Sequence, residues 1–221
     1  MPKKLFYETV SPLLKSILEL LMKEDIFKAF RLVGGTALSL QLGHRKSVDI
    51  DLFTEAEYES VDFDTIEKYL EGQFSYLDTF DFGAIGFGKS YFVGESADQS
   101  IKLDLYYTDP FIRPVLKIDG IRFNEIDDIV AMKIDVVARG GRKKDFWDLH
   151  ELLTDYSIGQ MLQLHKERYP YTHNEKEILS NFIKFENADA DFDPVCLRGK
   201  YWEIIKLDIL DALQNMNIKA L

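Results

Sequence analysis

The sequence of 221 residues is poor in cysteine, with Cys196 alone, and it has no long run of uncharged apolar residues. A single cysteine cannot close an internal disulfide, and it is too few for a cysteine-rich zinc module. No stretch approaches the roughly 20 apolar residues that a transmembrane helix needs. Glu8 also interrupts the apolar segment that a signal peptide would need near the N-terminus. These absences predict a cytoplasmic protein that has no membrane partner.

Positive charge is also scarce, because 27 Lys and Arg residues stand against 38 Asp and Glu residues and the formal net charge is −11. A protein that coats DNA or RNA would carry a basic footprint instead. The hydrophobic fraction of 46% and the aromatic fraction of 13% are enough for a packed core, and they exclude an intrinsically disordered chain.

Hydrophobic periodicity predicts an α+β fold. In the first half, apolar residues three and four apart indicate helices, and short apolar runs that stop at glycine indicate strands. The helices predicted there cover residues 11–22, 36–42 and 62–74. The predicted strands cover 30–33, 47–54, 82–88, 90–93, 101–107 and a hairpin of 115–118 with 121–123. Asp119-Gly120 is a strong signal for the turn of that hairpin.

Helical periodicity dominates from residue 125 onward. The helices predicted there cover 125–138, 143–154, 157–168, 173–186 and 199–217, and a loop is predicted at 187–194. We therefore expect a mixed β-sheet core with flanking helices at 1–124, and a helical C-terminal region at 125–221.

An acidic pair lies on the strand predicted at 47–54. Side chains alternate between the two faces of a strand, so Asp49 and Asp51 share one face, and Val48, Ile50 and Leu52 point to the other, which is buried. Two adjacent carboxylates repel each other unless a cation lies between them. Mg²⁺ prefers oxygen ligands and is often held by one or two carboxylates together with substrate phosphates. The pair is therefore suited to a metal that also binds a nucleoside triphosphate (NTP), with a solvated strand face as the alternative.

A glycine-rich turn precedes this pair. Gly34-Gly35 stands between a predicted strand and the helix that begins at Thr36. Glycine lets the backbone come close to a ligand, and the free N–H groups of a helix start favour phosphate. Thr36 can cap the helix or donate to a phosphate oxygen. We expect the three residues to bind the triphosphate, although an ordinary turn before a helix would look the same.

A third carboxylate is expected on a neighbouring strand. Within 101–107, Asp104 shares a face with Lys102 and Tyr106. Three acidic groups at Asp49, Asp51 and Asp104 would support two-metal chemistry, in which one metal activates the attacking oxygen and the other stabilises the leaving pyrophosphate. A surface aspartate on a meander strand is the alternative.

The helix predicted at 125–138 carries Lys133 in the middle of its apolar arc. An unpaired buried charge is costly, so we expect Lys133 to contact Asp145 or Asp148 of the next helix. Such a pair is either structural or places Lys133 near the triphosphate.

Basic residues are concentrated in two places. Residues 139–144 include Arg139, Arg142, Lys143 and Lys144, and His44-Arg45-Lys46 precedes the acidic strand. Both runs flank the predicted pocket, where phosphates of a nucleotide or an RNA end would lie. We expect the first run to contact RNA or phosphate, and Arg45 and Ser47 to contact the nucleotide; solvated charge is the alternative.

Four short motifs together resemble the AbiEii/AbiGii toxin family, a branch of the DNA polymerase β-like nucleotidyltransferase superfamily. They are Gly34-Gly-Thr-Ala-Leu38, Arg45-x-Ser47-x-Asp49-Ile-Asp51-Leu-Phe53, Ala131-x-Lys133 and Arg142-x-Lys144-Asp145-x-x-Asp148-Leu149. The resemblance spans residues 30–153, and its specificity lies in the combination and order of the motifs.

The resemblance implies a nucleotidyltransferase-like core in which Asp49 and Asp51 bind metal and Gly34, Gly35 and Thr36 surround the triphosphate. Lys133 and either Asp145 or Asp148 would complete the site. Proteins of this type commonly serve as toxins of toxin–antitoxin or phage-defence systems, and some add nucleotides to tRNA. Ser47 lies where modification by a partner would block such a site.

The function predicted from the sequence is transfer of a nucleoside monophosphate from an NTP to a hydroxyl. The favoured acceptor is the 3′ end of a tRNA, and a protein side chain or a small molecule is the alternative. The expected cofactor is Mg²⁺, with Mn²⁺ as a substitute, and the expected protein partner is an antitoxin. One alternative is a catalytically silent module that presents 139–144 to a protein or RNA. Another is a sugar-nucleotide glycosyltransferase with Asp49-Ile-Asp51 as its metal motif.

Overall fold

The computed structural model describes residues 4–80 and 87–219. The chain divides into two compact units. Unit 1 comprises Met1–Leu42 and Ser47–Asn124, and unit 2 comprises Gly43–Lys46 and Glu125–Leu221. No helix in the described ranges combines the length and apolar character needed to cross a membrane.

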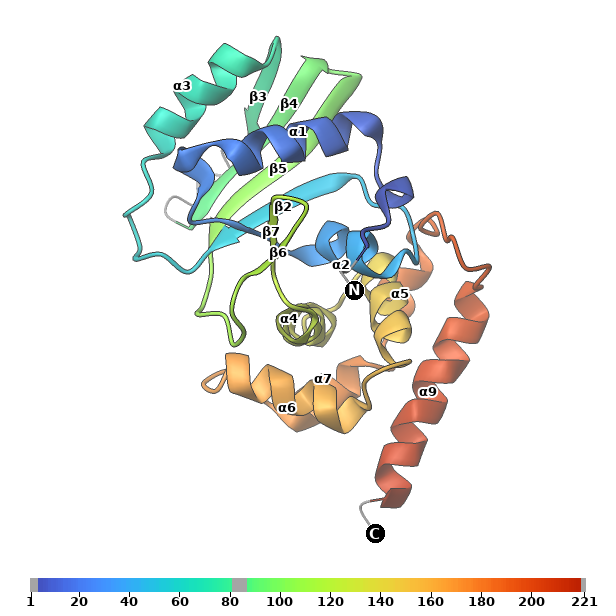
Figure 1. Cartoon of the computed structure of the whole chain (residues 1–221). Helices are drawn as coiled ribbons and strands as arrows, with labels where there is room; N and C mark the ends of the chain where they lie inside the picture. The colour runs from blue at the N-terminus through green and yellow to red at the C-terminus, as the bar shows by residue number, and fades with distance from the viewer. Residues whose placement is uncertain (1–3, 81–86, 220–221) are drawn as a thin grey trace. The chain divides into compact units, whose positions relative to one another are not determined.

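In its described residues, unit 1 contains three α-helices and the strands of one mixed sheet (Figure 1). The helices are α1 (Pro12–Lys23), α2 (Gly34–Leu42) and α3 (Phe63–Gln73), with short 3₁₀ turns at Tyr7–Thr9 and Asp25–Phe27. The strands are β1 (Arg31–Leu32), β2 (Asp49–Thr54), β3 (Tyr76–Phe80), β4 (Gly88–Ser96), β5 (Gln99–Tyr107), β6 (Leu116–Ile118) and β7 (Ile121–Phe123). Their order in the sheet is β3-β4-β5-β2-β1-β7-β6. The mixed sheet, with the helices that follow it in the chain, confirms the predicted α+β class.

The centre of the sheet is formed by β2, which pairs in parallel with β5 and antiparallel with β1. Helix α1 contacts β2, β5 and β7 and lies across the sheet in Figure 1. The first turn of α1 is fixed by Ser11, whose hydroxyl accepts the Leu14 N–H, and by Pro12 at the first helical position. Its buried side chains are Leu14, Ile17, Leu18, Leu21 and Met22. This apolar stripe supplies part of the core that holds β2 in place.

The alternation predicted for β2 is confirmed along the strand, where Ile50 and Leu52 are fully buried and Asp49 and Asp51 are partly exposed. The prediction was wrong for Val48, whose exposed fraction is 67%. The strand begins only at Asp49, so the strand alternation does not extend to Val48.

Two other differences concern element boundaries in unit 1. Helix α2 begins at Gly34, two residues before the predicted start, so both glycines lie in its first turn. Strand β3 pairs antiparallel with β4 at the edge of the sheet, ahead of the first strand predicted in that region. Of that predicted strand, 82–88, residues 82–86 lie outside the described ranges.

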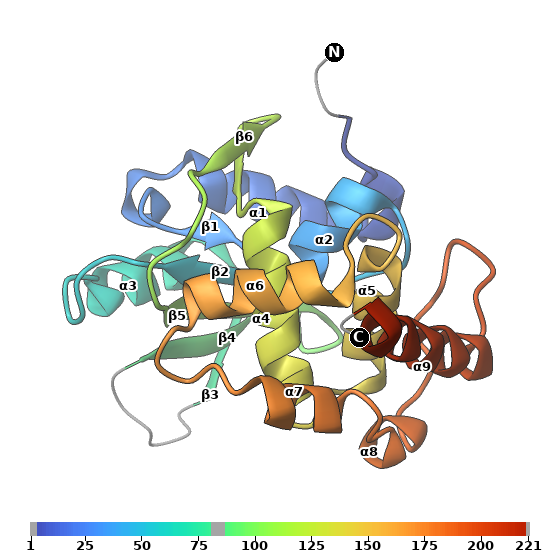
Figure 2. The ribbon, with the colours of Figure 1, turned by 90° about the horizontal axis from the view of Figure 1, so that it is seen from below.

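Unit 2 is helical. Its helices are α4 (Ile126–Ala138), α5 (Lys143–Leu152), α6 (Ile158–Arg168), α7 (Glu175–Asn181), α8 (Glu186–Asp189) and α9 (Trp202–Lys219). Helix α4 contacts α5, α6 and α7, and Figure 2 shows α6 crossing it. An aromatic group joins α5 to α8 and α9: the Phe146 and Phe185 rings lie 5.1 Å apart, and the Phe185 and Trp202 rings lie 5.7 Å apart.

The single helix predicted at 173–186 is wrong, because the chain forms α7 and α8 instead. Asn181 donates from its side chain to the Ala138 carbonyl, and the Phe182 side chain is fully buried. Both contacts are made where α7 ends, so tertiary packing overrides helical periodicity there. The last helix begins at Trp202 rather than at the predicted residue 199, where Gly199 has a left-handed φ of +63°.

Two glycines of unit 1 provide a test of the backbone. A Cβ added at Gly120 or Gly72 would meet no atom within 4 Å, but Gly120 has a φ of +81° in the hairpin turn and Gly72 lies inside α3. We expect Gly120→Ala to lower the free energy of unfolding by about 1 kcal/mol. The control Gly72→Ala should raise it by about 0.5 to 1 kcal/mol. Urea unfolding checks both, and the same sign for the two variants would contradict the assignment of the turn.

Candidate active site

Three carboxylates lie on one face of unit 1 because of the pairing of two strands. In the parallel pair β2–β5, Asp49 lies opposite Lys102, and Asp51 lies opposite Asp104. The alternate residues of both strands, Ile50, Leu52, Leu103 and Leu105, are fully buried on the other face. The prediction that Asp104 lies on a strand next to the acidic pair is confirmed.

Lys102 lies among these carboxylates. Its ammonium donates to Asp104 Oδ2 over 2.5 Å, and the side chains of Lys102 and Asp104 are 37% and 16% exposed. Partial burial would lower the pKa of Lys102, but the hydrogen bond and charge of Asp104, with the charges of Asp51 and Asp49, raise it overall. The other oxygen of Asp104, Oδ1, is buried and has no hydrogen-bond partner within the described part of the chain. Asp104 is therefore only half satisfied.

Gly34 lies against Asp51. Its φ is +67°, and a Cβ at this position would lie 2.5 Å from Asp51 Oδ2. The Asp51 carbonyl also accepts the Val33 N–H over 2.9 Å. A glycine is therefore needed here for two reasons, the left-handed backbone and the space taken by the Asp51 carboxylate. The group that the Gly34 backbone approaches is Asp51, and the approach of this turn to a triphosphate stays a prediction.

Thr36 connects the start of α2 to the start of β2. Its side chain is fully buried, its hydroxyl donates to the Asp49 carbonyl, and its Oγ1 lies 2.8 Å from the Ser47 hydroxyl. Ser47 in turn donates its N–H to the Thr9 carbonyl over 2.8 Å. These contacts fix the backbone of Asp49. The Thr36 hydroxyl, predicted to bind a phosphate, is engaged within the protein.

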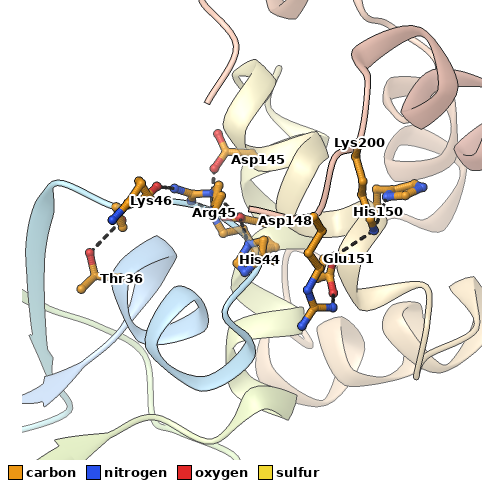
Figure 3. A network of polar contacts seen from close by, with 12 residues as sticks. Thr36, His44, Arg45, Lys46, Asp145, Asp148, His150, Glu151 and Lys200 are labelled. Carbon is orange, nitrogen blue, oxygen red and sulfur yellow. Dashed lines mark hydrogen bonds and ion pairs between the residues drawn. The ribbon is translucent and has the colours of Figure 1, made fainter. Parts of the chain in front are cut away.

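Unit 2 contains a buried charge cluster centred on Asp148, which has no exposed area (Figure 3). Arg45 binds both oxygens of Asp148, with Nε 2.6 Å from Oδ1 and Nη2 2.8 Å from Oδ2. His44 Nε2 lies 2.8 Å from Oδ1, and Lys133 Nζ lies 2.7 Å from Oδ2. Two cations and a histidine thus surround one carboxylate.

Asp145 adds the second negative charge of this cluster. Its Oδ1 accepts from Lys133 over 2.7 Å, and its Oδ2 accepts the Arg142 N–H at the start of α5 over 3.0 Å. The predicted contact of Lys133 with Asp145 or Asp148 is confirmed, and both contacts are made. Burial alone would raise the pKa of Asp148, but Arg45, Lys133 and the His44 hydrogen bond hold it well below its usual range. Burial alone would lower the pKa of Lys133, but the two aspartates raise it to about 12.

The cluster also anchors the short segment 43–46 in unit 2. The Leu197 N–H donates to the His44 carbonyl over 2.9 Å, and the Lys46 N–H donates to the Val195 carbonyl over 2.8 Å. The side chain of Arg45 is 4% exposed and also donates to the Lys46 carbonyl. Arg45, predicted to contact the nucleotide, is thus held by Asp148 inside unit 2.

The basic run at 139–144 is divided by its surroundings. The side chains of Arg139 and Arg142 are 72% and 67% exposed, although Arg139 pairs with Asp135 and Arg142 lies 3.5 Å from Asp191. Lys143 is 7% exposed and donates to Asp193 over 2.9 Å. Lys144 is partly buried. The two arginines therefore present most of the exposed positive charge of this run.

Two residues of these clusters were missed as functional by sequence reasoning. Lys102 was recognised only as a neighbour of Asp104, although its i, i+2 spacing on a strand already places both on one face. His44 was counted as part of a basic patch, whereas its side chain is 1% exposed and binds Asp148. That contact spans 104 positions, and no local pattern reports it.

Among residues 4–80 and 87–219, no group of three or more His, Cys, Asp and Glu side chains is arranged to hold a metal ion as it stands. The carboxylate face of unit 1 nevertheless supplies oxygen donors, which Mg²⁺ prefers. Asp104 Oδ1 is a buried oxygen with no partner in the described ranges. Asp49, Asp51 and Asp104 therefore fit a divalent ion in their chemistry, and the cation now bound to Asp104 is Lys102.

The fold is that of nucleotidyltransferase-like proteins of known structure. JHP933 from Helicobacter pylori superposes with a TM-score of 0.57 at 20% identity, covering 94% of this chain and 90% of that one. The nucleotidyltransferase toxin MenT4 from Mycobacterium tuberculosis superposes with a TM-score of 0.51 at 14% identity, covering 88% and 83%. An uncharacterised protein of Aquifex aeolicus, aq_aa25, is 29% identical over 218 residues, which is 91% of this chain and 96% of that protein.

The model of one protein family matches residues 16–215, and its description is nucleotidyl transferase AbiEii toxin, type IV toxin–antitoxin system. The match covers most of the chain, so the protein belongs to this family. The resemblance seen in the four sequence motifs is thereby confirmed.

The Asp148 cluster generates a stability prediction. Asp148→Asn would leave Arg45 and Lys133 buried with one carboxylate fewer, so we expect the free energy of unfolding at pH 7 to fall by about 3 to 5 kcal/mol. Asp208→Asn, which removes an exposed partner of His150, should change it by less than about 1 kcal/mol. Urea unfolding measures both.

The wild type and Asp148→Asn also give a test of the pH dependence of stability. The pKa of Asp148 is lower in the folded state than in the unfolded state, where it is about 3.9. The ionised carboxylate therefore contributes its full stability at a pH above the unfolded pKa, and this stability is lost as the pH falls toward the folded pKa. The difference between wild type and Asp148→Asn should therefore be constant from about pH 5 to pH 8 and shrink below about pH 4. A difference that grows in acid would contradict the assignment of an ionised Asp148.

Proposed function

We propose that this protein transfers a nucleoside monophosphate from an NTP to a hydroxyl acceptor, and that the acceptor is the 3′ end of a tRNA. As a member of a toxin family, it would be controlled by a cognate antitoxin protein. The observation that carries the proposal is the single face of the β2–β5 pair, where Asp49, Asp51 and Asp104 stand together beside the glycine-rich start of α2.

The proposed cofactor is Mg²⁺, with Mn²⁺ as a substitute, held by Asp49, Asp51 and Asp104. All three side chains offer oxygen donors, and Asp104 has an unused buried oxygen. When bound, a divalent ion would favour deprotonation of the attacking hydroxyl and offset the charge that develops on the leaving pyrophosphate. Metal dependence is thus part of the proposal.

The residues of unit 1 have separate tasks in this proposal. Gly34 leaves open the space that the Asp51 carboxylate occupies, and Thr36 holds the backbone of Asp49 through a hydrogen bond to its carbonyl. The first N–H groups of α2 have no intrahelical partners, so they are suited to bind phosphate oxygens of the NTP. An aspartate of the carboxylate face would accept the proton of the acceptor hydroxyl as it attacks the α-phosphorus, and pyrophosphate would leave.

For the residues of unit 2, the proposal includes fewer roles in the reaction. Catalytic roles for Lys133, Asp145 and Asp148, and a nucleotide contact for Arg45, stay predictions. Within unit 2 these side chains bind one another and hold segment 43–46. A nucleotide contact for Ser47, the residue that follows this segment, also stays a prediction.

The carboxylates can be tested by activity. With labelled NTPs, total cellular RNA and Mg²⁺, we expect Asp49→Asn and Asp51→Asn to lower label transfer by about a hundredfold or more, since even outer partners of a bound metal are worth about 10- to 100-fold. Asp104→Asn should also lower it. The control is Asp78→Asn, an exposed aspartate on β3 of the same sheet.

Unchanged transfer in both Asp49→Asn and Asp51→Asn would remove this site. If the wild type transfers no label to any RNA and yet captures a partner protein equally well after Asp49→Asn, the chain is a binding module on the same fold.

The RNA acceptor generates a separate prediction. Arg139 and Arg142 carry exposed positive charge in unit 2, so the double variant Arg139→Ala/Arg142→Ala should raise KM for RNA a few-fold and leave KM for the NTP unchanged. It should also flatten the salt dependence of RNA binding, because each lost phosphate contact reduces the slope by about 1. Lys176→Ala, at an exposed position on α7, is the control. Equal effects on both KM values would argue against an RNA contact here.

A further inference from the structure

Lys102 is a cation on the carboxylate face, among Asp49, Asp51 and Asp104. It shares this face with Asp104 on β5 and stands opposite Asp49 on β2. Its ammonium is bound to Asp104 Oδ2 over 2.5 Å, and it also interacts electrostatically with Asp51 and Asp49. One lysine thus partly neutralises the three groups proposed to hold the metal.

We infer that Lys102 is a tethered counter-ion of the carboxylate face, which neutralises Asp104 while no metal is bound and competes with a divalent ion for this carboxylate. The inference rests on the proposed metal-dependent transfer. It assigns Lys102 a positioning role, because the lysine acts through Asp104 and sets the affinity for the metal.

The state of Asp104 supports this competition. Its Oδ2 is occupied by Lys102, and its Oδ1 is buried without a partner in the described ranges. A divalent ion and an ammonium compete for the same carboxylate because both are attracted by its charge. A metal that binds Asp104 through either oxygen therefore has to overcome the charge of Lys102 and weaken its hydrogen bond, and this reduces the apparent affinity for the metal.

The ammonium of Lys102 has space to move away from Asp104. Its side chain is 37% exposed, so the flexible four-carbon stem can carry the ammonium into solvent, where it is strongly hydrated. Asp51 differs from Asp104, because the backbone of Gly34 lies directly against its carboxylate. In this inference Asp51 is always a ligand of the metal, whereas the metal competes with Lys102 for Asp104.

Metal binding without nucleotide tests the inference directly. We expect Lys102→Met and Lys102→Gln to bind Mn²⁺ at least about fivefold more tightly than the wild type, since a positive charge next to the site is removed. The dissociation constant is measured by electron paramagnetic resonance of free Mn²⁺, with folding checked by circular dichroism. Lys102→Arg keeps the charge and should stay within about twofold of the wild type.

Lys89→Met is the matched control. Lys89 lies on β4 of the same sheet, is 41% exposed and donates to a carboxylate of another residue, Glu67, over 2.7 Å. The Lys89→Met variant should bind Mn²⁺ with the same affinity as the wild type. The gain from Lys102→Met should also be smaller in an Asp104→Asn background, because the lysine then no longer has the carboxylate for which the metal competes.

The outcomes separate the inference from the proposed function. Equal or weaker Mn²⁺ binding by folded Lys102→Met and Lys102→Gln, with clear binding by the wild type, overturns the inference and leaves the metal site standing. An equal gain in Lys89→Met also overturns it, because the effect would then be general charge. Absence of Mn²⁺ binding in every variant overturns both the inference and the metal dependence of the proposed function.

Discussion

The parallel pairing of β2 with β5 determines where the charged groups of unit 1 lie. Ile50, Leu52, Leu103 and Leu105 are fully buried on one face of this pair, and burial of each contributes about 1.5 to 3 kcal/mol. A shift of one residue in register would exchange the two faces of a strand. Repulsion among three partly exposed carboxylates is much weaker than this, since solvent screens it. The apolar face therefore sets the register, and the acidic face follows from it.

The Asp148 cluster of unit 2 and the carboxylate face of unit 1 differ in how completely their carboxylates are paired. In unit 2, the carboxylates of Asp145 and Asp148 are buried and bound by Lys133 and Arg45, as buried charge requires. In unit 1, the carboxylates remain partly exposed, and Asp104 keeps an oxygen without a partner in the described ranges. A completely paired cluster fixes backbone and resists ligands. In an incompletely paired cluster, a bound cation can still stabilise the carboxylate oxygens that lack a partner.

Periodicity alone predicted which side chains share a face, and it succeeded where the face was already decided by apolar neighbours. The period of a strand placed Asp49 and Asp51 on one face. The period of a helix indicated that Lys133 is a buried cation and that it needs a partner. Periodicity failed where a contact between segments far apart in the sequence decides the local structure or the burial of a side chain. Asn181 and Phe182 end α7 through tertiary packing, and His44 is buried against a residue 104 positions away. The proximity of Gly34 to Asp51 is of the same kind, because a turn glycine and a site glycine look identical in sequence.

The proposed action on RNA has to be reconciled with the charge of the chain, because a net charge of −11 opposes association with phosphate. The exposed arginines Arg139 and Arg142 each lie near an aspartate, so their local field is weakened further. Such a surface cannot hold RNA tightly at physiological salt. An enzyme that modifies one end of its acceptor does not need tight binding, since only interactions that strengthen in the transition state increase its rate. Weak, salt-sensitive contact with the acceptor, combined with a firmly built carboxylate face, is therefore a consistent design for nucleotidyl transfer by this protein.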